Sequence, residues 1–261
     1  MSQTWTITKR DFLSYFKVPM GWVLCALYAI VSGFYFSIML NYNYVDASAV
    51  LKFMRGLFFV LIPLLTMRAF AVEKKNGTEI LYATSSVSSG QYVIAKYISS
   101  SLVFLCISAV NILYIFTTLG FNGVIDIRYW GTLIAYLLTG LTYIAIGLFT
   151  SSLTSNQIIA AAVSFVIFVA FEIFGSISTS IGSAIKSLVN TLDFNDNISA
   201  AREASIGQAV TDALNWLNPS TKLEGFYDGT FDILSIIYFI SLSIIFLFIT
   251  KQIIESTRWK K

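Results

Sequence analysis

The sequence predicts an all-α integral membrane protein with six transmembrane helices, an N-terminal interfacial amphipathic helix and an extracellular helical segment between helices five and six. Of its 261 residues, 56% are hydrophobic and 12% are charged, whereas soluble domains average about 25% charged residues. Mean hydropathy is +0.75, and the apolar residues form blocks long enough to cross a bilayer. We therefore expect one transmembrane domain over residues 1–261.

A membrane-spanning helix needs roughly 20 apolar residues, because the hydrocarbon core is about 30 Å thick and a helix rises about 1.5 Å per residue. The stretches that meet this requirement are approximately 21–40, 57–72, 98–119, 129–153, 158–174 and 233–250. The first is too long for the apolar core of a cleaved signal peptide, so we expect it to remain as a helix. Pro63 falls inside the second and predicts a kink there, because proline removes a backbone hydrogen bond.

Basic residues predict which side of the membrane each loop faces. With the N-terminus in the cytoplasm, eleven of the 17 Lys and Arg residues lie inside and six outside. Three of the six belong to the long outer segment, which the rule discounts. Both termini are therefore expected in the cytoplasm.

Residues 1–20 predict a helix that lies in the plane of the lipid headgroups before Pro19 and Gly21 interrupt it. Aromatic and aliphatic side chains fall on a broad face, and basic side chains surround that face, as is typical of interfacial helices. The apolar residues are Trp5, Ile7, Phe12, Leu13, Tyr15 and Phe16, and the basic residues are Lys9, Arg10 and Lys17. Taken alone, such a helix is a membrane anchor.

A polar segment, residues 73–90, separates the second and third apolar blocks. Asn76 and Gly77 predict a turn, and residues 78–84 can form about two helical turns. Ser88 and Gln91 match the S-x-x-Q capping box and predict the start of the helix that leads into the third span. Two interpretations remain open. The segment is a solvated loop that satisfies the charge rule, or it is a docking element that transmits force from a soluble partner.

Catalytic, metal-binding and nucleic-acid functions have little support in the sequence. It contains no histidine, which excludes imidazole zinc sites and Ser-His-Asp triads. Cys25 and Cys106 lie in apolar blocks at no metal or redox spacing, and no G-x-x-x-x-G-K-[ST] phosphate loop is present. The net charge of +3 does not indicate nucleic-acid binding. We expect no catalytic residue, no metal site and no cofactor bound by this chain.

The order of several short motifs resembles the permease subunit of ABC type-2 exporters, with the gliding-motility-type branch as the nearest match. The aromatic N-terminal helix is followed by EKKNGTEILYATSSVSSGQYVIAKY (73–97), AIGLFTSSLTSNQIIAAAVSF (145–165) and FLFITKQIIESTRWK (246–260). The resemblance covers nearly the whole chain. It implies six spans per subunit, a homo- or heterodimer of permeases in a bacterial plasma membrane, and a separate ATP-binding subunit that carries ATP and Mg²⁺.

The resemblance also implies where that subunit docks. The connecting helix would be residues 4–17, with Trp5, Lys9, Arg10, Phe12 and Phe16. The coupling region would comprise Glu73, Lys74, Lys75, Gly77, Thr78, Glu79 and Leu81. The chain departs from the family in the length of segment 175–230, where the family has compact re-entrant helices. Apolar residues there predict two amphipathic helices, 177–192 and 206–217, packed on the permease or on an extracellular accessory protein.

Polar residues and glycines inside the spans are further candidates. Glu172 is the sole acid within a span, and Arg55 lies at similar depth and could pair with it; a structural pair and a role in gating or translocation both stay open. Asn111 in the third span is more typical of an interhelical hydrogen bond than of a substrate ligand. Gly140 and Gly147 lie one heptad apart and predict close helix packing.

Three functions are compatible with these features. The first is the permease of an ATP-driven exporter, and the second is a mechanotransmission scaffold that moves an extracellular partner through the same ATPase. The third, an ion-driven secondary transporter, is disfavoured by the near absence of intramembrane acids and of paired broken repeats. The aromatic and aliphatic interior suits lipids, peptides and amphipathic drugs equally, so the sequence does not select a substrate.

Overall fold

The computed structural model describes residues 3–42, 46–78, 87–121, 123, 125–192 and 218–259. Two compact units make up the chain: Met1–Phe165 together with Phe226–Lys261, and Val166–Gly225. All regular structure in the described ranges is helical, which confirms the predicted all-α class. The prediction of a single transmembrane domain stays a prediction.

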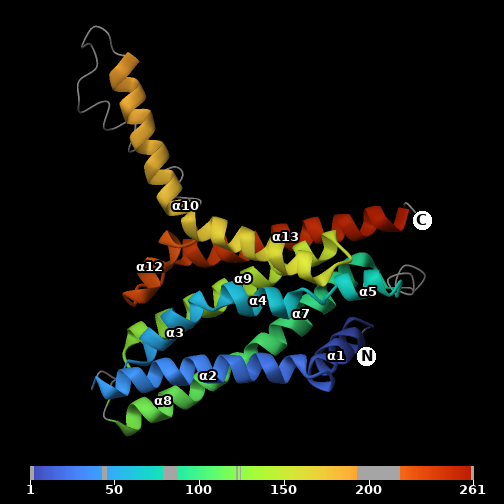
Figure 1. Ribbon diagram of the computed structural model, residues 1–261, viewed down its shortest axis with the longest axis horizontal. Coiled ribbons are helices and arrows are strands. Elements are labelled where there is room, and N and C mark those ends of the chain that lie inside the picture. The colour runs from blue at the N-terminus through green and yellow to red at the C-terminus, as the bar shows by residue number, and fades with distance from the viewer. Residues whose placement is uncertain are drawn as a thin grey trace. The chain divides into compact units, whose positions relative to one another are not determined.

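Figure 1 shows the described helices in chain order. They are α1 (Gln3–Lys17), α2 (Met20–Asn41), α3 (Ala47–Gly56), α4 (Phe58–Thr66), α5 (Ala71–Lys75), α7 (Ser89–Ser108), α8 (Val110–Gly120), α9 (Ile127–Leu153), α10 (Gln157–Leu192), α12 (Thr221–Tyr227) and α13 (Ile233–Trp259). Within the described ranges, five segments are long and apolar enough to cross a membrane, or up to six if the bent pair α3 and α4 counts as one span.

Helix α9 is the centre of the larger unit. Its most apolar window is 67% buried, whereas the windows of the other four candidate spans are 17% to 33% buried. It packs against α3, α4, α7 and α13. The outer helices therefore present wide apolar faces to the surroundings, as expected for a protein whose solvent is lipid.

Two glycines allow the close approach of neighbouring helices to α9. A Cβ atom at Gly140 would lie 2.3 Å from the Phe104 ring of α7, and one at Gly147 would lie 2.2 Å from Thr66 Oγ1 of α4. Real Cβ atoms do not approach other atoms this closely, so only glycine fits at either position. The predicted packing at this glycine pair is confirmed, and it lies inside the chain.

The second span contains a sharp bend that was not predicted from the sequence. The 59° bend lies between α3 and α4, at Leu57. There the Leu57 amide donates to Met54, three residues back, and Gly56, a poor helix former, precedes the break. Pro63 lies inside helix α4, and a kink at Pro63 stays a prediction.

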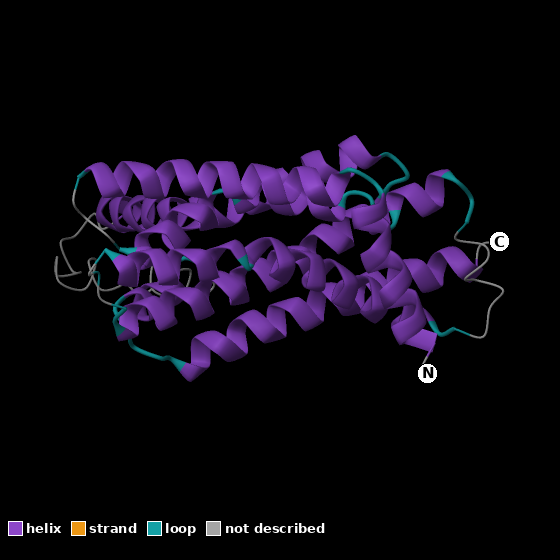
Figure 2. Cartoon of the chain, turned by 90° about the horizontal axis from the view of Figure 1, so that it is seen from below, coloured by secondary structure: helices purple, strands orange, loops and turns teal. Residues whose placement is uncertain are grey.

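The larger unit has two distinct ends. Helix α1, helix α5 and the C-terminal end of α13 lie at one end, and the start of α3 and the end of α8 lie at the other (Figures 1 and 2). The segments predicted as connecting helix and coupling region therefore share one end of the bundle with the last turns of the chain.

Helix α10 is longer than any predicted element. It contains 36 residues, about 54 Å at 1.5 Å per residue, and its candidate span ends at Phe174. The predicted outer helix 177–192 is thus the continuation of α10 and not a separate element, because the isolated Gly175 does not end a helix. The second predicted helix, 206–217, lies outside the described residues.

Candidate functional site

Helix α1 has two different faces. Ile7, Thr8, Asp11 and Tyr15 are buried on the side that packs against α7. Trp5 and Leu13, by contrast, are 48% and 40% exposed. The single broad apolar face expected from the sequence is therefore divided: one part packs within the bundle together with polar residues, and the aromatic part stays outside.

The aromatic face of α1 continues into α2. The rings of Phe12 and Phe16 lie 5.2 Å apart, and those of Phe16 and Trp22 lie 5.7 Å apart. Trp22 Nε1 donates a hydrogen bond of 3.0 Å to the Phe16 carbonyl. This bond crosses the elbow, the connection between the end of α1 at Lys17 and the start of α2 at Met20. Because exposed Trp side chains concentrate at membrane–water interfaces, Trp22, which is 64% exposed, places this elbow at headgroup depth.

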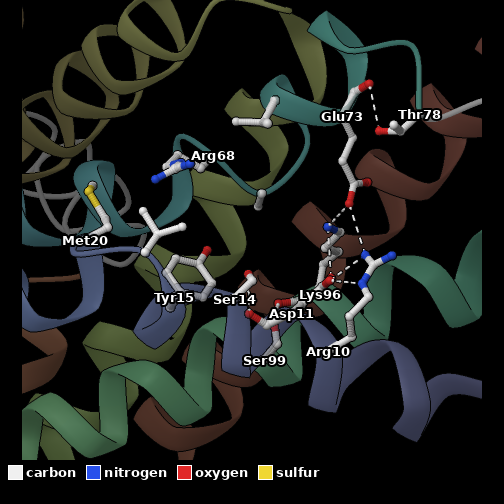
Figure 3. A pocket seen from close by; sticks show the side chains of 13 residues that line it. Arg10, Asp11, Ser14, Tyr15, Met20, Arg68, Glu73, Thr78, Lys96 and Ser99 are labelled. Atoms are coloured by element: carbon white, nitrogen blue, oxygen red, sulfur yellow. Dashed lines mark hydrogen bonds and ion pairs between the residues drawn. The ribbon is translucent and has the colours of Figure 1, made fainter.

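A charged cluster forms on the buried face, with Lys96 of α7 at its centre (Figure 3). Lys96 Nζ lies 2.6 Å from Glu73 Oε1 of α5 and 2.9 Å from Asp11 Oδ2 of α1. The side chains of Lys96, Asp11 and Glu73 are only 6%, 8% and 16% exposed. The Asp11 contact is ionic, since Oδ2 accepts no well-aligned hydrogen bond. One ammonium thus joins three helices.

Arg10 and Tyr92 complete the charged cluster, which comprises Arg10, Asp11, Glu73, Tyr92 and Lys96. Arg10 Nη2 lies 2.5 Å from Asp11 Oδ1 and 3.3 Å from Glu73 Oε1, and the Tyr92 hydroxyl donates to Glu73 Oε2. Two cations therefore face two carboxylates. Buried charges require this kind of compensation, because burial removes their hydration.

Tyr15 holds α1 against the end of α4. Its hydroxyl donates a hydrogen bond of 2.9 Å to the Leu65 carbonyl. Burial raises the pKa of Tyr15 to about 12, so the hydroxyl keeps its proton at physiological pH. Helix α1 is thus joined to the second span by a neutral hydrogen bond and to the third by ion pairs.

Helix α5 is also bound on the side of α9. Ser151 Oγ accepts hydrogen bonds from the Phe70 and Ala71 amides, at 3.1 and 3.3 Å, and donates to the Met67 carbonyl at 3.2 Å. The first amides of a helix have no partner within it, so Ser151 caps α5 from another helix. Lys74 Nζ donates to the Ser152 carbonyl. Residues at the end of α9 therefore hold α5 in place.

Replacing Ser151 with alanine is expected to lower the free energy of unfolding by about 1 kcal/mol, the usual cost of losing a helix cap. Ser152→Ala is the matched control, because the Ser152 hydroxyl bonds only to Phe149 of its own helix and the backbone carbonyl that accepts from Lys74 is unchanged. Denaturant unfolding of both variants in detergent micelles gives the comparison. Equal stability of the two variants would contradict the capping role.

The rest of the predicted coupling region is partly described. Gly77 has a φ of +70°, which confirms the turn, and the capping box of Ser88 and Gln91 is confirmed at the start of α7. Lys75 and Gly77 are exposed, and the Thr78 hydroxyl donates to the Glu73 carbonyl at 3.3 Å. The remaining two positions, Glu79 and Leu81, lie outside the described residues.

The polar candidates within the spans occupy other places. Asn111 is buried and exchanges hydrogen bonds of 2.8 and 3.0 Å with the Tyr28 hydroxyl of α2, so it joins two helices. Arg55 lies in the last turn of α3. Glu172 Oε2 accepts a hydrogen bond of 3.2 Å from Ser220. The pair of Glu172 with Arg55, and a gating role for any of the three, stay predictions.

A comparison with protein families agrees with this architecture. A family model described as ABC-2 family transporter protein matches residues 5–231. The chain belongs to the ABC-2 transporter family. A search of curated proteins found no match. The predicted resemblance is confirmed at this level, and the gliding-motility-type branch stays a prediction.

As a member of the ABC-2 family, the chain is a multi-pass permease component of an ABC transporter. Sequence reasoning missed three residues that organise its charged cluster and cap α5, namely Asp11, Lys96 and Ser151. A usable signal existed for the first two. Asp11 is the sole acid in a helix otherwise surrounded by basic residues, and Lys96 lies inside the helix of the third span, where a charge needs a partner. Ser151 gave no comparable signal.

Proposed function

We propose that the chain is the permease subunit of an ATP-driven exporter, and that a separate nucleotide-binding subunit, which carries ATP and Mg²⁺, docks on α1 and on the segment that follows α5. The observation that carries the proposal is Glu73. This residue, expected in the coupling region, is bound by Arg10 of α1 and by Lys96 of α7. Helix α5, which leads into the proposed docking segment, is thus joined to α1 and α7 by largely buried charges.

The contacts of α5 support a transmission mechanism. Lys96 and Tyr92 hold Glu73 on the side of α7, and Ser151 holds the start of α5 on the side of α9. Breaking a buried ion pair costs about 3 to 5 kcal/mol. We therefore expect α7 and α9 to move together with α5, because a movement of α5 alone would break its contacts with them. Both helices contain candidate spans, so the movement reaches the translocation path.

The same proposal extends to topology and assembly. Six crossings with both termini in the cytoplasm of a bacterium agree with the shared end of α1, α5 and the end of α13 (Figure 1) and with the excess of Lys and Arg assigned to that side. A second permease copy, identical or different, completes the path. The low burial of the outer spans, 17% to 33%, leaves apolar faces for that copy and for lipid.

Charge reversal at Lys75 tests the docking surface. Lys75 is exposed at the end of α5, and Lys75→Glu is expected to reduce the amount of nucleotide-binding subunit that copurifies with the chain by about tenfold, because a rim charge of the wrong sign costs on the order of 1 to 2 kcal/mol. Lys52→Glu is the control, since Lys52 is also exposed but lies on α3, where it faces the Tyr227 ring at 4.8 Å, and belongs neither to α1 nor to α5. Mass spectrometry of the purified assembly measures the ratio. Equal recovery from both variants would refute the assignment.

Glu73→Gln separates transmission from docking. The side chain is largely buried, so the nucleotide-binding subunit should still copurify, whereas the loss of the carboxylate weakens the link to Lys96 and Arg10. We expect ATP hydrolysis to continue while its response to the permease is lost. ATPase activity of the complex in nanodiscs, compared with that of the nucleotide-binding subunit alone, gives the readout. A Glu73→Gln complex whose ATPase responds like the wild type would exclude the coupling role.

The length of α10 favours mechanotransmission as a second candidate. About 18 of its residues continue beyond the candidate span that ends at Phe174, which corresponds to about 27 Å of helix. A rigid extension of this length can carry movement to an extracellular accessory protein. ATP turnover that depends on an added substrate supports the exporter. Turnover independent of substrate, with a stable outer partner in the purified assembly, supports mechanotransmission.

A further inference from the structure

A cavity of about 400 Å³ lies between α1, the turn after α4, and α7. Part of its wall is the charged cluster, and Tyr15, Met20 and Arg68 lie on the other side (Figure 3). Val18 also lines the cavity. The cavity therefore has a polar side and an apolar side. All of its lining residues belong to the larger unit.

Among the described residues that line the cavity, the charges do not balance. Three cations, Arg10, Arg68 and Lys96, line it against two carboxylates, Asp11 and Glu73. Arg10 and Lys96 each contact both carboxylates. Arg68 makes no ion pair and no hydrogen bond with any residue that the structure describes, and it lies on the Met20 side of the cavity, away from the ion pairs (Figure 3). The described part of the chain therefore leaves one half-buried guanidinium available to an anionic ligand.

The depth of the cavity indicates where that anion comes from. Val18 and Met20, in its wall, lie within four residues of Trp22, whose exposed ring marks the membrane–water interface. Val18 is itself 37% exposed, so the apolar side of the cavity is open to the surroundings at headgroup depth. A basic pocket between helices at this level is suited to a lipid headgroup.

We propose that this cavity is a phospholipid site, in which Arg68 binds the headgroup phosphate and the acyl chains pass along Val18 and Met20 into the bilayer. A guanidinium offers two parallel N–H donors that match two phosphate oxygens. The bound lipid neutralises the third cation and fills the space between α1 and the second span. The cavity shares the charged cluster with the proposed coupling link, but Arg68, which binds the phosphate, makes no ion pair or hydrogen bond with that cluster among the described residues.

A titration of the purified assembly with dioleoylphosphatidylglycerol, followed by native mass spectrometry, tests the site. We expect one lipid bound per chain in the wild type and an apparent Kd about tenfold higher in Arg68→Gln, the usual cost of losing a charge-assisted hydrogen bond. Lys17→Gln is the matched control. Lys17 is exposed at the end of α1 and is not among the described lining residues of the cavity, and its replacement removes the same charge. Equal affinity of Arg68→Gln and Lys17→Gln overturns the proposal.

A second pair of variants keeps the test valid if Arg68→Gln does not fold. Val18→Asp places a negative charge on the exposed apolar side of the cavity and is expected to weaken lipid binding at least as much. Leu13→Asp is its control, since Leu13 is 40% exposed on α1 and does not line the cavity. Lipid binding that is the same in both variants contradicts the proposed path of the acyl chains.

Two ligands distinguish the source of the anion. Dioleoylglycerol has the same acyl chains without the phosphate, so its binding should be the same in the wild type and in Arg68→Gln. If the wild type binds dioleoylglycerol as tightly as the phospholipid, phosphate recognition is excluded. Inorganic phosphate supplies the anion alone. We expect the lipid to remain bound in millimolar phosphate. If phosphate displaces the lipid, the cavity is a site for free anions and the lipid assignment is overturned.

Discussion

Lys96→Met is expected to lower the free energy of unfolding by about 3 to 5 kcal/mol, the range measured when one partner of a buried ion pair is removed. The methionine leaves Asp11 and Glu73, 8% and 16% exposed, with only the exposed Arg10 as a countercharge. Their repulsion and lost solvation act at the junction of α1, α5 and α7. Equilibrium unfolding of the purified chain in mixed micelles measures the change.

A surface ion pair is the control for this result. Lys251 pairs with Glu255 at 3.6 Å, and both side chains are more than a third exposed, so Lys251→Met removes the same charge where water screens it. We expect little or no change there. Adding Asp11→Asn to Lys96→Met should recover part of the lost stability, because one of the two uncompensated carboxylates is removed. Equal losses from Lys96→Met and Lys251→Met would show that the cluster does not hold the helices together.

Gly140→Ala is expected to destabilise the bundle by about 1 to 3 kcal/mol, as overpacking of a filled core does. The added Cβ would lie 2.3 Å from the tip of the Phe104 ring. That ring cannot move aside readily, because it is fully buried and packs against the rings of Phe58 and Tyr136 at 5.5 and 5.6 Å. The same unfolding measurement gives the value.

Two companion variants isolate the steric cause. Gly56→Ala makes the same substitution where a Cβ meets nothing within 4 Å, so only the gain in helix propensity remains and stability should hold or rise. Phe104→Leu shortens the side chain that Gly140 faces, and the double variant Gly140→Ala with Phe104→Leu should lose less stability than the sum of the single changes. Additive losses would place the cost of Gly140→Ala elsewhere.

The predictions that succeeded rest on local physics. The span lengths follow from bilayer thickness, the turn at Gly77 from its need for positive φ, and the capping box of Ser88 and Gln91 from hydrogen bonds within four residues. Family membership agrees with the order of the short motifs along the chain. The 59° bend between α3 and α4 was missed, because Gly56 is a weaker signal in sequence than Pro63.

The candidate site was predicted only in part. Glu73 and Lys74 were expected in the coupling region, and Arg10 in the connecting helix, but their partners were not. Periodicity placed Tyr15 and Phe16 on one apolar face of residues 4–17, whereas the structure buries Tyr15 with Asp11 and leaves the aromatic face outside. A helix that touches protein on one side and lipid on the other has two apolar sides, and a single periodic pattern does not separate them.

Composition and spacing alone determined that this chain is helical, that it belongs in a bilayer, and the approximate positions of its apolar segments and of the turn at Gly77, because each of these depends on residues close together in the chain. Only the tertiary structure decided that Asp11, Glu73 and Lys96 meet, that Ser151 caps a helix some 80 residues earlier, and that Arg68 faces a cavity. Charges separated by dozens of residues carry no record of their partners in the sequence, since pairing depends on which helix faces touch.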